Sequence, residues 1–262
     1  MNNRLVDIEE EMPVAGLPTA AYEQPAPGRY RPARVRALFD GLAASYGWGE
    51  WLSAGLLRRW RRQAVARLRR PAAGAAYVVD LMAGGAELWP LLRQHFGPEL
   101  QVAAVDFSAP MLARAAARNA GPALSLLHAD ALAAPLPAGQ ATAVTCAFGL
   151  KTLPVNKYAA LANETARLLR PGGEVALVEL MLPPQGWRRR VVLSYLGGLL
   201  PVLRRLQPST ALHAELPRYA SQGPDLPALT IALQQAGFIN IRQRRLWPGC
   251  AVLLTARKLL CN

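Results

Sequence analysis

Three aspartates stand at regular intervals, each closing or directly following a short apolar run. They are Asp80, Asp106 and Asp130. In an open α/β sheet, ligands bind outside the carboxyl ends of the strands, where acidic side chains can accept hydrogen bonds from a ribose or an adenine edge. Asp106 lies about 20 residues beyond a turn that contains Gly84 and Gly85, which is the spacing expected for an acid that accepts ribose hydroxyls. The spacing therefore predicts a site for an adenosine-bearing ligand.

The segments that would position these aspartates alternate between apolar runs and helical patterns. The apolar runs cover residues 76–82, 101–106, 124–127, 142–147 and 174–179. Such runs, separated by helices of about 10–15 residues, are typical of parallel strands that are covered on both faces. Two further runs, 238–244 and 251–255, are joined by a gap too short for a crossover helix and must pair antiparallel. We expect an α/β fold with a mostly parallel seven-stranded sheet, helices on both faces and a closing antiparallel hairpin.

Composition excludes several classes of protein. The 262 residues are 52% hydrophobic and 18% charged, which rules out a wholly disordered chain. The three cysteines lie far apart, which excludes a disulfide scaffold and a cysteine zinc site, so no metal is expected. We see no secretory signal and no apolar run of about 18 residues, so we expect a cytoplasmic protein without a membrane span.

Residues 1–32 carry five prolines and little apolar periodicity, so we expect a flexible N-terminal arm followed by a single domain at 33–262. Helical spacing begins near Val35 and returns between Trp51 and Leu68, where the remaining positions hold arginines without an acid. Residues 187–205 form a further distinctive stretch, with about thirteen apolar residues between two arginine clusters.

Motifs at the strand ends resemble those of class I S-adenosylmethionine-dependent methyltransferases. The matching segments are Asp80-Leu-Met-Ala-Gly-Gly-Ala86, Val105-Asp106, Ala129-Asp130 and Leu168-Leu-Arg-Pro-Gly-Gly173. Within that class, the chain resembles the ubiquinone/menaquinone biosynthesis C-methyltransferases. That similarity rests on Phe148-Gly-Leu-Lys151, on Phe39, Tyr46, Gly55 and Trp60, and on Gln235-Ala-Gly-Phe238. The resemblance covers residues 35–258.

This resemblance implies a Rossmann-like class I methyltransferase fold with S-adenosylmethionine as cofactor and S-adenosylhomocysteine as product. The methyl group would pass to a small aromatic, quinone-like or natural-product acceptor. Residues 33–73 would form an N-terminal helical lid, and residues 185–225 an insertion on the acceptor side. The implied cofactor-binding residues are Asp80, Met82, Ala83, Gly84, Gly85, Asp106, Phe107, Met111, Asp130, Ala131, Ala147 and Phe148.

The turn after the first strand departs from the family pattern. Two of its glycines are replaced by Ala83 and Ala86, Gly85 stands where many relatives have threonine, and Ala147 stands where they have serine. A β-methyl group can obstruct a backbone that needs a positive φ or a close approach to a ligand. Either the cofactor binds in an adapted pose, or the chain is a degenerate methyltransferase fold with altered chemistry or a non-catalytic binding role.

No catalytic base can be assigned from the residue pattern. A methyl acceptor of the phenol type needs a base or a cation that stabilises its phenolate. The candidates are Tyr46, Lys151, Tyr195 and His213, with His128 and Tyr219 weaker still. Tyr46 and Lys151 are best placed by the family pattern. Cys146 lies inside an apolar strand without a paired histidine, so we expect a packed core thiol.

A formal net charge of +13 favours anionic partners. A nucleic-acid substrate is disfavoured because the segment after the fourth strand lacks both the Asn/Asp-Pro-Pro-aromatic box and the Pro-Cys pair of base methylation. A dehydrogenase is disfavoured because the turn is not G-x-G-x-x-G. The arginine-rich helices either contact anionic lipid at a membrane surface or hold solvated arginines on the domain. The oligomeric state is open, a dimer included.

Overall fold

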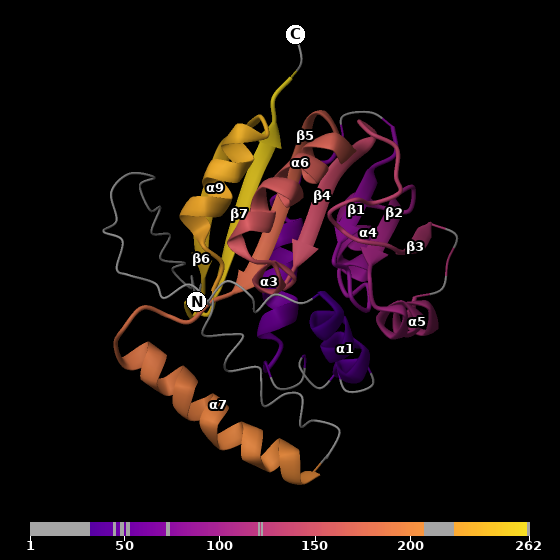
Figure 1. The fold of residues 1–262 in the computed structure, drawn as a ribbon. Coiled ribbons are helices and arrows are strands. Elements are labelled where there is room, and N and C mark those ends of the chain that lie inside the picture. The colour runs from indigo at the N-terminus through magenta and orange to yellow at the C-terminus, as the bar shows by residue number, and fades with distance from the viewer. Residues whose placement is uncertain are drawn as a thin grey trace, which may run out of the picture.

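The computed structural model describes residues 32–43, 46–47, 50, 53–71, 74–119, 121, 123–206 and 223–260. In this part of the chain, seven strands form one sheet in the order β3-β2-β1-β4-β5-β7-β6 (Figure 1). The strands are β1 (Tyr77–Leu81), β2 (Gln101–Asp106), β3 (Leu124–His128), β4 (Ala141–Ala147), β5 (Leu169–Leu180), β6 (Phe238–Leu246) and β7 (Ala251–Lys258). Strands β1 to β5 are parallel, and β7 is antiparallel to both of its neighbours. The predicted α/β architecture and its antiparallel hairpin are confirmed.

Strand β5 begins earlier than the expected position 174. Its pairing with β4 joins Ala141 to Leu169 and then Ala143 to Glu174, so the intervening residues bulge out of the register. Gly172 has φ +71 in this bulge, a conformation that glycine adopts without steric cost. The predicted Arg-Pro-Gly-Gly turn is thus absorbed into the first part of the strand.

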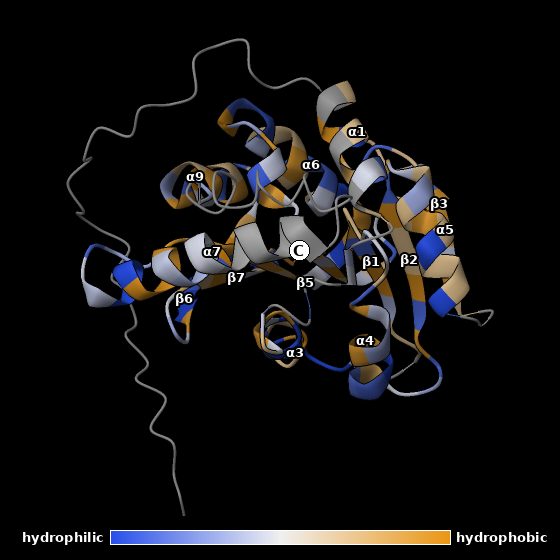
Figure 2. Ribbon diagram, turned by 90° about the horizontal axis from the view of Figure 1, so that it is seen from below, coloured by the Kyte–Doolittle hydropathy of each residue, from blue (hydrophilic) through white to orange (hydrophobic). Residues whose placement is uncertain are grey.

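Helices cover both faces of the sheet (Figure 2). They are α1 (Pro32–Leu42), α3 (Leu56–Val65), α4 (Trp89–Phe96), α5 (Ala109–Arg118), α6 (Tyr158–Leu168), α7 (Trp187–Leu206) and α9 (Leu226–Gln235), with 3₁₀ turns η1 (Leu150–Thr152) and η2 (Val155–Lys157). Val78 belongs to the core that contains α3 and α4, whereas its neighbour Val79 belongs to the core that contains α6 and α9. Both faces are buried because successive side chains of a strand point to opposite sides.

Helix α3 lies across the sheet and runs against the direction of β5. The Trp60 indole Nε1 donates a hydrogen bond to the backbone oxygen of Trp247 at 2.8 Å, just beyond the carboxyl end of β6. Near the other end of the helix, the Arg69 backbone N donates to a Glu174 carboxylate oxygen at 2.7 Å, beside the start of regular pairing in β5. The first half of α3 therefore lies at the carboxyl edge of the sheet, where Asp80 and Asp106 also end their strands.

The predicted flexible arm, residues 1–32, falls almost wholly outside the described residues, as do His213 and Tyr219. The predicted helix at 187–205 is confirmed as α7. Among the helices that the structure describes, none combines the length and apolar character needed to cross a bilayer.

Candidate functional site

The turn after β1 brings its backbone toward the end of β2. The Ala83 backbone N donates to the Val105 oxygen at 3.0 Å, and Gly84 follows with φ +56. Ala83 has no positive φ, so its backbone conformation does not require glycine. Ala86 has φ +54, a left-handed conformation that costs an L-residue about 1–2 kcal/mol. Of the two substituted glycines, only the one at Ala86 leaves strain in the backbone.

Gly85 lies against the side chain of Glu87, which follows the turn. A Cβ built at this position would collide with the carboxylate of Glu87, which folds back over the turn. The threonine of many relatives is therefore incompatible with the position that Glu87 takes here. A larger side chain at Gly85 would require the Glu87 carboxylate to move.

Asp106 holds the turn from the neighbouring strand. Its two carboxylate oxygens accept hydrogen bonds from the Gly84 backbone N at 2.7 Å and from the Ser108 backbone N at 2.9 Å. The side chain is buried. Burial raises the pKa of Asp106, and these backbone hydrogen bonds partly oppose that rise because they favour the charged form.

Asp80 lies at the centre of the edge, between β2 and β4. It is 2% exposed, and its Oδ1 accepts a hydrogen bond from the Thr145 hydroxyl at 2.8 Å. Burial raises the pKa of Asp80 to about 7, while the Thr145 hydrogen bond lowers it. Near neutral pH this carboxyl is therefore close to half-protonated, so a cationic ligand can draw it into the charged form.

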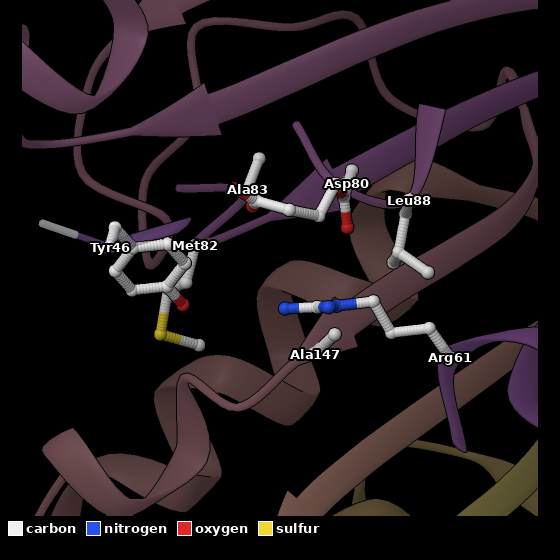
Figure 3. Close-up of a pocket in the computed structure, with 8 residues that line it drawn as sticks. Tyr46, Arg61, Asp80, Met82, Ala83, Leu88 and Ala147 are labelled. Carbon is white, nitrogen blue, oxygen red and sulfur yellow. The ribbon is translucent and has the colours of Figure 1, made fainter. Parts of the chain in front are cut away.

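Two small adjoining cavities open at this edge, and Tyr46 borders both. Figure 3 shows the first of them. The first is lined by Tyr46, Arg61, Asp80, Met82, Ala83, Glu87, Leu88 and Ala147. The second is lined by Phe39, Tyr46, Met82, Gly84, Asp106, Phe107, Ala147, Phe148, Gly149 and Thr152. Together the two linings contain eight of the twelve predicted cofactor residues.

Arg61 enters the first cavity from α3, and the sequence pattern did not single it out. We expected it on the same arginine-bearing face as Arg58 and Arg62, but its side chain is only 3% exposed. The guanidinium forms an ion pair with Glu50 and lies 5.0 Å from the centre of the Phe148 ring. Its burial follows from the packing of α3 on the sheet, which no local pattern reports.

Glu87 was also missed, although an acid directly after a glycine turn could have indicated it. Its side chain is 9% exposed, and its Oε1 accepts no hydrogen bond although it is buried. Arg118 Nη1 approaches this oxygen to 3.6 Å, which makes an ion pair without a hydrogen bond. A buried carboxylate oxygen in this state is ready to accept a donor from a ligand.

Helix α1 covers the second cavity. Phe39 contacts Phe107 edge to face, with ring centres 6.4 Å apart, and the Ser108 hydroxyl donates to Asp40 at 2.5 Å. Ser108 is also the N-cap of α5, where its side chain accepts from the Met111 backbone N. One serine thus ties the covering helix to the loop that carries Asp106.

Besides Gly85, three predicted cofactor residues line neither cavity. Met111 is fully buried, and its Cε would be 3.1 Å from a Cβ built at Gly84. The Met111 side chain therefore packs against the turn. Asp130 is exposed, and its Oδ1 accepts a hydrogen bond from the Leu132 backbone N at 2.9 Å. Ala131 is buried beside it.

The structure separates the candidate bases. Tyr46 borders the cavities, and burial followed by the charge of Glu87 raises the pKa of Tyr46, which keeps its hydroxyl protonated. Lys151 lines neither cavity, and its Nζ lies 3.8 Å from a carboxylate oxygen of the fully buried Glu179. Tyr195 lies on α7, and His128 is exposed with its Nε2 3.0 Å from the Phe107 oxygen.

Cys146 is fully buried in the core between β4 and α6, as predicted, and burial raises the pKa of its thiol well above the usual range. The thiol therefore stays in its neutral form, which is a poor nucleophile. Cys146 acts as an apolar core residue next to the site.

Comparison with known proteins agrees with this geometry. Residues 29–258 match the ubiE/COQ5 methyltransferase family. A demethylmenaquinone methyltransferase from Thermus thermophilus is 34% identical over 220 residues, which cover 82% of this chain and 97% of the relative. A 2-phytyl-1,4-naphtoquinone methyltransferase from Thermosynechococcus vestitus is 30% identical over 226 residues, which cover 86% of this chain and 99% of the relative.

Among solved structures, geranyl diphosphate C-methyltransferase from Streptomyces coelicolor A3(2) superposes with a TM-score of 0.55 at 15% identity. The match covers 79% of this chain and 82% of the other. At this level of identity the likeness concerns the fold, and it confirms a Rossmann-like class I architecture.

Proposed function

Because the chain belongs to the ubiE/COQ5 methyltransferase family, we propose that it binds S-adenosylmethionine at the carboxyl ends of β1 and β2 and methylates a small quinone-like acceptor. The observation that carries the binding site is the convergence of Asp80, Glu87 and Asp106 around the turn at Gly84. The relatives from Thermus thermophilus and Thermosynechococcus vestitus are quinone methyltransferases by name, which supports the acceptor class.

The first cavity fits the amino-acid end of the cofactor. Glu87 Oε1 is buried and ion-paired with Arg118 but accepts no hydrogen bond, and Asp80 lines the same cavity, so two carboxyls could accept hydrogen bonds from an ammonium group. Arg61 is the cation among the residues that line this cavity, and a guanidinium binds a carboxylate through paired N–H donors. These three residues would hold a zwitterionic group by its two charges.

The second cavity fits the nucleoside end. Asp106 would accept hydrogen bonds from the ribose hydroxyls while it remains anchored by the Gly84 and Ser108 backbone amides. Phe107 and Phe39 offer aromatic surface to an adenine ring. Asp130 would lie toward the adenine edge, where the Leu132 amide fixes its carboxylate. When bound, S-adenosylmethionine supplies an electrophilic methyl group on a sulfonium centre.

Tyr46 stands between the two cavities and keeps its proton, so it would donate a hydrogen bond and not serve as a base. A ring carbon next to a phenol hydroxyl becomes nucleophilic when that hydroxyl loses its proton. Methylation there would break the bond between the methyl carbon and the sulfonium sulfur, leaving S-adenosylhomocysteine, and would form one carbon–carbon bond while the ring hydrogen leaves as a proton. The acceptor must therefore be the reduced hydroquinone form of a quinone.

The segments around the edge would supply the acceptor side. We propose that residues 33–73 act as a lid, since α1 is tied to the Asp106 loop through Asp40 and Ser108. Of the predicted 185–225 insertion, residues 207–222 lie outside the described residues; its described start at α7 would border the acceptor, since α7 begins shortly after β5 leaves the same edge.

The test is calorimetric titration of S-adenosylmethionine into the wild type and Asp106→Asn, with Glu99→Gln as control. Glu99 is an exposed acid in the loop before β2, at the opposite edge of the sheet. Loss of one charge-assisted pair of hydrogen bonds should weaken binding by about 2 kcal/mol, or roughly thirtyfold. Equal affinity in Asp106→Asn would remove the ribose assignment. Absence of heat at millimolar ligand in the wild type would favour the non-catalytic alternative.

The acceptor is tested separately with a prenylated 1,4-naphthohydroquinone that lacks a substituent on the neighbouring ring carbon. Mass spectrometry should detect one added methyl group in place of a hydrogen. Binding of S-adenosylmethionine without any methylated product from this compound would retain the cofactor site and reject the quinone-like acceptor.

A further inference from the structure

Helix α7 exposes a stripe of apolar side chains at one-turn spacing. Trp187, Val191 and Tyr195 lie four residues apart, which places them on one side of the helix, and they are 67%, 58% and 51% exposed. Leu193 is 42% exposed as well. Within the described part of the chain, α7 packs extensively against no other helix or strand, and it extends away from the sheet in Figure 1. An exposed stripe of this size marks an interaction surface.

The same helix is strongly basic. Its sequence contains five arginines and no acid, and three of them, Arg188 to Arg190, form its first turn. Arg188 and Arg190 are exposed, whereas Arg189 Nη1 donates to the Pro183 backbone oxygen at 3.4 Å. At helical spacing Arg188 and Arg190 flank the apolar stripe on its two sides, so the first turns of α7 present tryptophan and arginine together, as interfacial helices do.

A second exposed tryptophan lies at the same edge of the sheet. Trp247 is 61% exposed, and the Arg59 guanidinium of α3 lies 5.6 Å from its ring centre. The loop that leads to α7 packs beside it, because the Met181 backbone N donates to the Cys250 oxygen at 2.9 Å. The carboxyl edge therefore presents two exposed tryptophans together with several arginines.

From this surface we infer that the protein docks on an anionic lipid bilayer, with Trp187, Val191 and Trp247 in the interface and Arg59, Arg188 and Arg190 at the headgroups. We call these six residues the docking surface. Charge complementarity selects the occupant, since each arginine near an anionic membrane adds attraction, and tryptophan favours the boundary between headgroups and acyl chains. A second copy of this chain is disfavoured because two α7 helices, each with five arginines and no acid, would repel one another.

The orientation agrees with a reaction on a lipid-soluble acceptor, although the docking itself does not depend on the proposed chemistry. The docking surface and the two cavities lie at one edge of the sheet, since Arg61 of α3 reaches the first cavity while Arg59 reaches Trp247. A prenylated molecule could then pass between bilayer and cavity without crossing bulk water.

The experiment is co-sedimentation of the full chain with vesicles of phosphatidylcholine alone and of phosphatidylcholine with phosphatidylglycerol. We expect binding to the anionic vesicles only, weakening as salt rises. Arg188→Gln combined with Arg190→Gln should weaken it about twenty-fivefold, at about fivefold for each arginine. Trp187→Ser combined with Val191→Ser should weaken it more than tenfold.

Matched controls separate this surface from general charge and hydrophobicity. Arg93→Gln combined with Arg170→Gln removes two exposed arginines elsewhere, and Ile231→Ser removes an apolar side chain that is 53% exposed on α9. Both controls should bind vesicles within a factor of about five of the wild type. The thermal unfolding midpoint of every variant shows whether the fold is kept. Neither this measurement nor the vesicle assay needs cofactor or acceptor.

Three results would overturn the inference. The first is absence of binding to anionic vesicles. The second is a loss of binding in the controls as large as that in the α7 variants. The third is a wild-type dimer that becomes a monomer in the Trp187→Ser, Val191→Ser variant while vesicle binding stays unchanged. Because cofactor calorimetry is measured independently, failure of lipid docking leaves the proposed methyltransferase site untouched, and the reverse also holds.

Discussion

Replacing Asp80 by asparagine should make the protein more stable and at the same time abolish tight cofactor binding. Burial raises the pKa of Asp80 from 3.8 to about 7, so the folded state holds a proton that the unfolded state releases between these values. Stability therefore falls as pH rises through this window. Well above pH 7, the cost of ionising this carboxyl in the folded state reaches about 4 kcal/mol, at 1.36 kcal/mol for each pKa unit. Asparagine carries no such cost, and its side-chain oxygen can still accept the Thr145 hydrogen bond.

The magnitude is best measured as a difference between two pH values. Between about pH 5 and about pH 8, the advantage of Asp80→Asn over the wild type should grow by about 3 kcal/mol. In a chain of this size, that corresponds to roughly 6 °C in the unfolding midpoint. Urea unfolding of both proteins at the two pH values gives the free energies directly. Asp130→Asn removes an exposed carboxyl and controls for the general effect of net charge.

The same variant should lose the stabilisation that S-adenosylmethionine gives to the wild type, because a neutral amide cannot pair with an ammonium group. An advantage of Asp80→Asn that is the same at both pH values would refute the inference that a buried, near-neutral carboxyl lies at the centre of the site. Retained cofactor stabilisation in Asp80→Asn would instead refute its pairing with the cofactor.

Three further substitutions test the surroundings of the site. Ala86→Gly should raise the free energy of unfolding by about 1 kcal/mol in urea titration, because it relieves a left-handed backbone at φ +54; a loss of stability would contradict the assigned strain. Ser108→Ala should lower the free energy of unfolding by about 1 kcal/mol, because it removes the cap of α5 and the hydrogen bond to Asp40. Calorimetry should also show weaker cofactor binding. Unchanged affinity would mean that α1 does not contribute to the site. Lys151→Met should destabilise the protein by about 3 kcal/mol at neutral pH, since Glu179 would remain buried without its cation. That loss should shrink at low pH, where Glu179 is protonated, and a loss that does not change with pH would argue against the ion pair.

The strand ends could be predicted because their signal is local. Asp80 and Asp106 each close an apolar run, and parallel strands end at one edge whatever the details of packing. The antiparallel hairpin was equally predictable, since the residues between β6 and β7 leave no room for a crossover. The bulge at the start of β5 was not, because Arg170 to Gly173 resemble an ordinary turn until the pairing of Ala141 with Leu169 is known.

Arg61 shows where local patterns stop. In the sequence it is one of several arginines on an amphipathic helix, and its burial depends on where α3 crosses the sheet. That crossing is set by contacts between residues far apart in the chain, such as Trp60 with Trp247. Glu87 is a different case, because this acid follows the glycine turn directly and could have been noticed in the sequence. In the structure, its carboxylate would lie against a side chain at Gly85. Lys151 was favoured by that pattern, yet its side chain pairs with Glu179 away from both cavities.

The distribution of unfavourable features argues against a purely structural role for this edge. Asp80 and Asp106 are buried acids with raised pKa values, and both end neighbouring strands. Met82, Ala86 and Phe148 are three of the five non-glycine residues with a left-handed backbone in the part of the chain that the structure describes, and all three follow β1 or β4 at this edge. A chain under selection for folding alone would replace such residues, since each costs about 1 kcal/mol or more. Strain and buried charge gathered at one place are expected where a ligand compensates for them, and a cation with a nucleoside would satisfy these acids. This concentration favours a working cofactor site over a degenerate fold that has lost its ligand.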